Sequence, residues 1–369
     1  DDSFNNKSAS VSVIDYVNVK SDQLTYFTDL LFSEKDDDSR FGYRSQFNYQ
    51  PSNFSYVSGS ILYFDENFQL NDFGYLRRAD WIHVGLGGGL KQINFSKESP
   101  VDQIDMNVDF NYDADTNGNS NPIRIDQKNE ITFKDTSKLK FDFGIKTSGK
   151  NTTITRKNPD FPFIKINKKK NITLDFEAAN YKFWTYDWRI SFEKGDKYNS
   201  WNSEGYKREF YKIAGSYFPN DNLKINLQYR IRKENEWLIW TEDNKFGLYD
   251  SEQDTFSMGL NWFSGNKHEI RLKSQFVALQ ADNPQSLISD SGGYLYESDE
   301  LIKPFAQGVV SFQVRYKYEI APLSYLYLVY SKGGTSYDED EDYSKSEIFN
   351  QPWNNPSDEV YSIKFRLKY

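Results

Sequence analysis

Apolar and polar side chains alternate over the last nine residues of the chain. Because successive side chains of a β-strand point to opposite faces, this segment has one apolar face and one polar face. The apolar face consists of Tyr361, Ile363, Phe365, Leu367 and Tyr369. The polar face consists of Ser362, Lys364, Arg366 and Lys368. The pattern favours a transmembrane β-barrel strand with lipid on one side and water on the other; the alternative is the edge strand of a soluble sheet.

The same two-residue period recurs along the whole chain. The clearest examples lie within residues 102–112, 137–147, 184–195, 222–233 and 308–321. Each repeat holds for roughly nine to eleven residues, which is the length that a tilted strand needs to cross a bilayer. Strands of soluble proteins average about five to six residues. Strand length therefore favours a membrane barrel over a soluble β-sandwich.

We predict about seventeen strands, separated by tight turns and longer loops in alternation. The strands are expected at 8–20, 23–33, 41–50, 53–64, 81–94, 102–112, 123–134, 137–147, 170–181, 184–195, 205–218, 222–233, 252–264, 267–280, 308–321, 324–332 and 358–369. Tight turns rich in turn-forming residues are expected at 50–53, 134–137, 219–222, 264–267 and 321–324. Longer polar loops are expected near 34–40, 65–80, 114–121, 148–169, 196–204, 234–251, 281–307 and 333–357.

Short turns on one side and long loops on the other are typical of outer-membrane proteins, in which the short turns face the periplasm. The predicted fold class is therefore all-β: a transmembrane antiparallel β-barrel of about 16–18 long strands, in a single domain over residues 1–369. Bacterial barrels normally have an even number of strands with both ends periplasmic. An odd count means either that one strand is miscounted or that upstream strands are missing.

Composition agrees with this class. Mean hydropathy is -0.79 and 17% of the 369 residues are aromatic. Such a polar chain has no run long enough for a membrane-spanning helix, and its aromatic content argues against disorder. The net charge of -9 argues against a nucleic-acid partner that depends on a basic field. The chain opens without a leader, so we expect an exported protein to be a processed or truncated form.

The polar faces of the predicted strands contain the candidate lumen-lining residues. The acidic candidates are Asp105, Asp109, Asp175 and Glu177. The basic candidates are Lys224, Arg230, Arg232, Arg271, Lys273, Arg315, Lys364, Arg366 and Lys368. We expect an acidic arc opposite a basic arc. Such an arrangement would set up a transverse field in a channel or dock folded loops and a plug through ion pairs.

Catalytic and metal-binding patterns are weak. Asp113–Asn121 begins like a calcium loop, with Gly118 at the sixth position, but Arg124 stands where the motif needs a bidentate Glu. An Asn- and Gly-rich hairpin loop explains this segment better. His83 and His268 are the only histidines, and the chain has no cysteine. We therefore predict no catalytic residues, no metal and no cofactor.

Two segments resemble a known family. Val310–Ser324, followed by Leu326–Gly334, resembles the end of an uncharacterised outer-membrane barrel family of Bacteroidota and some proteobacteria. Asn71–Asp80 is similar to a recurring loop of that family. The resemblance implies a barrel preceded by a periplasmic domain like a family-9 carbohydrate-binding module, and no established activity. We therefore expect this chain to be a truncated form, without the module and the first barrel strands that the resemblance implies.

The expected function is a channel or conduit in the outer membrane of a Gram-negative bacterium, or a membrane anchor for an envelope partner. The alternative is a non-transporting surface module that binds a glycan or an envelope complex through its long loops. Expected partners are outer-membrane lipid, lipopolysaccharide and the outer-membrane assembly machinery, which would read the C-terminal signal at Tyr361, Ile363, Phe365, Leu367 and Tyr369. We expect no enzymatic activity and no nucleic-acid partner.

Overall fold

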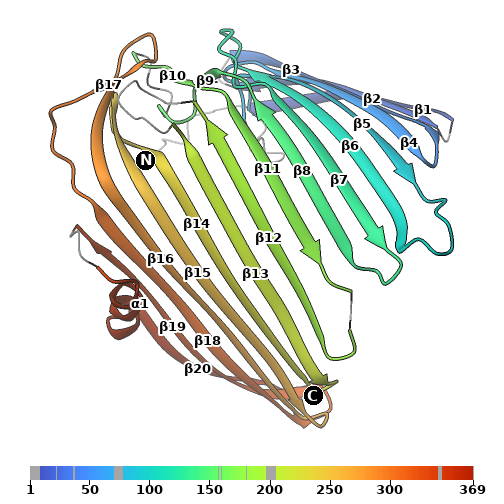
Figure 1. Cartoon of the computed structure of the whole chain (residues 1–369), viewed down its shortest axis with the longest axis vertical. Coiled ribbons are helices and arrows are strands. Elements are labelled where there is room, and N and C mark those ends of the chain that lie inside the picture. Colours follow the sequence, from blue (N-terminus) through green and yellow to red (C-terminus); the bar gives the residue numbers. More distant parts are fainter. Residues whose placement is uncertain are drawn as a thin grey trace, which may run out of the picture. The chain divides into compact units, whose positions relative to one another are not determined.

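In a computed structural model of the chain, the regular secondary structure is antiparallel β-strand apart from one short helix in the described residues (Figure 1). It describes residues 9–21, 23–35, 38–69, 78–156, 158, 160–179, 181–196, 205–339 and 343–368. Within these ranges, eighteen strands belong to one sheet and two short strands form a second sheet. None of the helical structure described there has the length and hydrophobicity needed to cross a membrane.

The strand bounds agree closely with the sequence pattern. The main sheet contains β1 (Ala9–Ser21), β2 (Leu24–Lys35), β3 (Asp38–Ser52), β4 (Ser55–Phe64), β5 (Trp81–Gln92), β6 (Val101–Ala114), β7 (Arg124–Phe133), β8 (Lys138–Lys146), β11 (Lys169–Glu177), β12 (Trp184–Gly195), β13 (Lys207–Asn220), β14 (Leu223–Glu242), β15 (Lys245–Ser264), β16 (His268–Ser289), β17 (Leu295–Glu297), β18 (Phe305–Ala321), β19 (Ser324–Asp338) and β20 (Asp358–Arg366). The small sheet pairs β9 (Gly149–Asn151) with β10 (Ile164–Ile166). Every predicted strand is present, so the all-β class and the number of long strands are confirmed.

The chain divides into two compact units. Unit 1 comprises Asp1–Ile131, Asp142–Asn171 and Asp290–Tyr294, and unit 2 comprises Thr132–Phe141, Ile172–Ser289 and Leu295–Tyr369. In unit 1, β1 to β6 pair consecutively as an antiparallel meander. In unit 2, β12 to β16 pair in the same way, and β16 then pairs with β18, β18 with β19 and β19 with β20.

The register gives the unit 2 meander one apolar face and one polar face. Residues directly opposite each other in antiparallel strands point to the same face. One apolar row, from β14 to β20, consists of Leu223, Trp262, Ile270, Tyr316, Leu328 and Ile363. The neighbouring row, one residue along each strand, consists of Lys224, Asn261, Arg271, Arg315, Val329 and Ser362. In the apolar row, Leu328, Trp262 and Ile363 are 38%, 39% and 69% exposed, and Leu223, Ile270 and Tyr316 are partly exposed.

Several of the predicted loops are wrong in part, because strands continue into them or form within them. The predicted loop at 34–40 contains the end of β2 and the start of β3, and the predicted loop at 148–169 contains β9 and β10. Residues 234–251 form a hairpin, in which β14 ends at Glu242 and β15 begins at Lys245. Opposed side chains such as Trp237 and Tyr249 hold this extension together in the ladder. The predicted loop at 281–307 contains the end of β16, all of β17 and the start of β18. The predicted loop at 333–357 contains the end of β19 and the helix α1 (Lys345–Asn354).

The helix α1 begins with a capping box. The Ser344 hydroxyl accepts a hydrogen bond from the Glu347 amide, and the Glu347 carboxylate accepts one from the Ser344 amide. The hydrogen bonds that Ser344 donates to this carboxylate lower the pKa of Glu347. Lys345, at the first helical position, pairs with Glu252 and with the buried Asp254 of β15. Burial alone would lower the pKa of Lys345, but hydrogen bonds to Asp254 and Glu252 raise it above its usual value.

Small residues on the apolar face allow α1 to lie close against the sheet. Ile348 is buried against Ala278 of β16 and Ala306 of β18. At Gly334 of β19, an added Cβ atom would lie only 2.2 Å from the Pro352 carbonyl oxygen. At the adjacent Gly333, whose register partners lie on the polar face, the nearest atom would be 3.8 Å from an added Cβ. The two neighbouring glycines therefore differ sharply in the space around them.

This difference gives a matched pair of substitutions. We expect Gly334→Ala to displace α1, because the new methyl group would clash with the helix backbone at a cost of about 1–3 kcal/mol. Hydrogen exchange of residues 345–354 should accelerate in Gly334→Ala and stay unchanged in Gly333→Ala. Equal exchange in both variants would contradict the packing described here.

Candidate functional site

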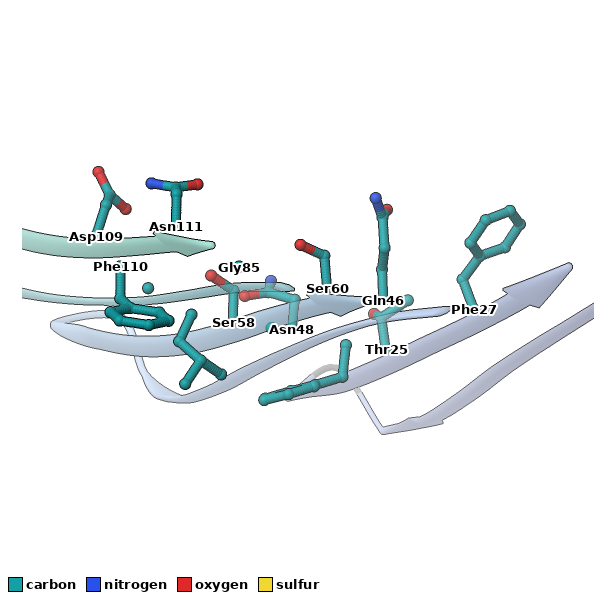
Figure 2. Close-up of a pocket in the computed structure, with 14 residues that line it drawn as sticks. Thr25, Phe27, Gln46, Asn48, Ser58, Ser60, Gly85, Asp109, Phe110 and Asn111 are labelled. Atoms are coloured by element: carbon teal, nitrogen blue, oxygen red, sulfur yellow. The ribbon is translucent and has the colours of Figure 1, made fainter. Parts of the chain in front are cut away.

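The polar face of unit 1 is lined by hydroxyl, amide and carboxylate groups. Figure 2 shows Gln46, Ser60, Asp109 and Asn111 pointing to one side of the strands and Phe110 to the other. These residues line a shallow pocket of about 410 Å³ over β2 to β6. Asp109, one of the predicted lumen residues, lies on this face and accepts a hydrogen bond of 2.9 Å from Lys128.

A larger polar cavity of about 1260 Å³ lies on the same face of unit 1, near the ends of β4 to β7. Asp113 is its best-defined polar group, because its Oδ1 accepts a hydrogen bond of 2.8 Å from Trp81 Nε1. The same oxygen lies 2.9 Å from His83 Nδ1. Other polar groups that line the space include the guanidinium of Arg124 and the amide of Asn117. The cavity is suited to hold a polar ligand by hydrogen bonds.

The sequence contained part of the signal for this cavity. Residues 113–121 form the hairpin loop that was favoured over a calcium loop, closed by a bridge between Ala114 and Ser120. Asp115 is buried and accepts a hydrogen bond of 2.7 Å from the Asn119 backbone amide. The Asp115 carboxylate is therefore bound within the loop itself. The cavity was missed because its other wall comes from residues 152–162, far along the chain.

Each acidic residue that was predicted to line the lumen has a basic neighbour. Asp105 lies 4.0 Å from Lys91 of β5. Asp109 pairs with Lys128 of β7. In unit 2, Asp175 Oδ1 lies 2.6 Å from Arg189 Nε, and Glu177 lies 2.9 Å from Lys140. These pairs neutralise the acids locally, so the polar face keeps little net negative charge at these positions.

Fewer of the basic candidates in unit 2 are paired with an acidic residue. Arg232 pairs with Glu234, whereas the Nε atom of Arg230 is buried without a partner among the described residues. Nearer the tight turns, seven cations share the polar face of β14 to β20, and we call them the cationic strip. The cationic strip consists of Lys224, Arg271, Lys273, Arg315, Lys317, Lys364 and Arg366. Lys368 follows Arg366 at the end of the chain and is also exposed.

One buried carboxylate lies at the centre of the cationic strip. Glu269 is only 7% exposed and faces three cations. It pairs with Arg271 on its own strand, lies 3.4 Å from Arg315 and lies 3.7 Å from Lys317. A single carboxylate cannot neutralise three cations, so a positive charge remains in this part of the polar face.

The C-terminal residues lie on the apolar face of β20 and beyond its end. Tyr361, Ile363, Phe365 and Leu367 are between 54% and 75% exposed, among the highest values for large apolar side chains. Tyr369, the last residue of the predicted assembly signal, lies outside the described residues, as does most of the family-like segment at 71–80. The four described residues form an exposed apolar edge beside Leu326, Leu328 and Tyr330 of β19.

Comparison with known proteins identifies a family. The profile of the family described as Domain of unknown function (DUF5916) matches residues 1–369. The comparison with curated proteins finds no match. Among solved structures, the chain is similar to the loop L8 deletion mutant of OmpT, an outer membrane protein of Vibrio cholerae, with 11% identity over 88% of this chain and 94% of that chain and a TM-score of 0.34.

It is also similar to the siderophore receptor PirA from Acinetobacter baumannii, with 7% identity over 97% of this chain and 70% of that chain and a TM-score of 0.46. These likenesses are low in identity and in TM-score, whereas the family profile spans every residue. The chain therefore belongs to the domain-of-unknown-function family DUF5916.

Proposed function

We propose that this chain is an outer-membrane β-barrel of a Gram-negative bacterium that serves as a conduit for polar solutes or as a membrane anchor for an envelope partner. In this proposal the apolar face contacts lipid and lipopolysaccharide. The polar face, with the predicted lining residues from Asp105 to Lys368, borders an aqueous lumen.

One observation supports this proposal most directly. The row from Leu223 to Ile363 places apolar side chains on six strands, with Trp262, Leu328 and Ile363 exposed and the other three partly exposed, and the adjacent row from Lys224 to Ser362 is mainly polar. An exposed apolar surface of this extent is unfavourable in water and marks contact with lipid or protein. Strands of 9 to 22 residues, longer than the soluble average, also agree with a bilayer-spanning role.

Reconstitution into liposomes tests the conduit. We expect the purified chain to conduct ions, and we expect Gly259→Trp, on the polar face beside Asn226, to lower the current by narrowing the aqueous path. The control is Leu260→Trp, one residue along on the apolar face, which should leave the current unchanged. A protein that inserts but passes no ion or solute would refute the conduit and leave the anchor.

The C-terminal residues give a test of outer-membrane assembly. We expect Phe365→Asp combined with Leu367→Asp to reduce the amount of folded protein in the outer membrane, because charged groups on the lipid-facing side disfavour insertion. Lys364→Gln, on the opposite face of the same strand, is the control. Heat-modifiable mobility of outer-membrane fractions measures the folded protein. Wild-type amounts of the double variant would contradict the proposed role.

The cavity of unit 1 favours a second candidate, a surface module that binds a glycan. Its amide, guanidinium and carboxylate groups resemble the planar polar groups that bind sugar hydroxyls, and Trp81 supplies an aromatic wall. A periplasmic carbohydrate-binding-module-like domain, which the family resemblance implies, would fit the same role.

A glycan array with the detergent-solubilised chain tests this second candidate. We expect Arg124→Ala and Asn117→Ala to weaken glycan binding, because both side chains line the cavity. Asn48→Ala, which lines the shallow pocket instead, should leave binding unchanged. Failure of the wild-type chain to retain any glycan or envelope protein would remove this candidate.

A further inference from the structure

The cationic strip has far more positive than negative charge. Its seven cations share the polar face with two carboxylates, Glu269 and Glu319, over the same rows of the register. Glu269 is already shared by Arg271, Arg315 and Lys317. Within the described part of the chain, no acid lies at ion-pair distance from Lys224, Lys273, Lys364 or Arg366.

The positions of these cations restrict what they can bind. They lie near the tight-turn ends of β14, β16 and β18 and on β20, and they point away from the apolar face. A lipid headgroup that contacts the apolar face would lie on the other side of the strands. The charges are therefore available to a solute on the polar face and are turned away from the membrane.

The chemistry of the strip suits oxyanions. Arg271 and Arg315 lie directly opposite each other on β16 and β18. Each guanidinium carries five N–H donors in a planar fork, and Glu269 occupies only part of them. Lys273 and Lys364 are exposed and add compact point charges to either side. Rings of Arg and Lys of this kind are the usual selectivity element of anion and phosphate pores.

We propose that the cationic strip makes this chain selective for anionic solutes, which carry phosphate, sulfate or carboxylate groups, with Arg271 and Arg315 at the centre of the binding surface. This inference rests on the proposed conduit and names the solute class that the conduit takes. The excess positive potential raises the local anion concentration, and the two guanidinium groups hold an oxyanion by paired hydrogen bonds.

Reversal potentials across a planar bilayer with a KCl gradient provide the main test. We expect the wild-type chain to pass chloride in preference to potassium. Lys273→Glu combined with Lys364→Glu should shift the permeability ratio toward potassium by about tenfold, since local potentials of this kind change ion concentrations by at least that factor. Glu269→Gln removes the central negative charge and should shift the ratio in the opposite direction.

The control is Lys303→Glu, which makes a single substitution of the same kind, with half the charge change of the double variant, on a side chain that is 70% exposed outside the strands. It should leave the permeability ratio close to that of the wild type. A wild-type current without anion preference, or a preference that the double variant does not alter, would overturn anion selectivity and leave the conduit intact.

Absence of any current would refute the conduit. A second measurement then tests whether the cationic strip binds anions. Calorimetric titration of tripolyphosphate into the detergent-solubilised full chain should show binding that weakens as salt increases. The same double variant should bind about tenfold more weakly, and Lys303→Glu should bind like the wild type. Absence of tripolyphosphate binding to the wild-type chain would overturn the anion site.

Discussion

The separation of apolar from polar side chains on the two faces of each long strand is the constraint on which the rest of the structure depends. Because the side-chain period is two, a slip of one residue between neighbouring strands would exchange the faces. The register from β14 to β20 places apolar residues opposite each other, such as Trp262 and Ile270, and polar residues opposite each other, such as Arg271 and Arg315. The faces, the exposed apolar surface and the cationic strip all follow from this single register.

The strands could be predicted from the sequence because the separation of the two faces requires apolar and polar residues to alternate along each strand. The alternation is less regular in the extended ends of some strands. In residues 234–242 the alternation is lost among charged residues and two tryptophans, and only main-chain pairing with 245–251 defines the strand. Helix α1 was missed although the capping-box signature Ser344-Lys345-Ser346-Glu347 is visible, since Pro352 and few apolar residues hide its periodicity.

The candidate site was predictable only in part, for a related reason. Parity along a strand gives the face of a residue such as Asp175 or Arg271, and the structure places both on the polar face. Parity does not identify the residue opposite on the neighbouring strand, because that residue depends on which strands pair and in which register. The pairs Asp175–Arg189 and Asp109–Lys128 turned an expected acidic arc into locally neutral pairs, while Glu269 left its three basic neighbours with excess charge. The balance of charge on the polar face is thus a property of the register.

Helix α1 covers part of the apolar face of unit 2. Over Ala278, Ala306 and Gly334, the wall is two layers thick, with Phe349 and Trp353 packed over Phe276. Any molecule that approaches the apolar face there meets the helix before it meets the strands. Contact between copies of this chain through the apolar face of unit 2 therefore either includes α1 or uses the part of that face nearer the tight turns, where Trp262, Leu328 and Ile363 are exposed.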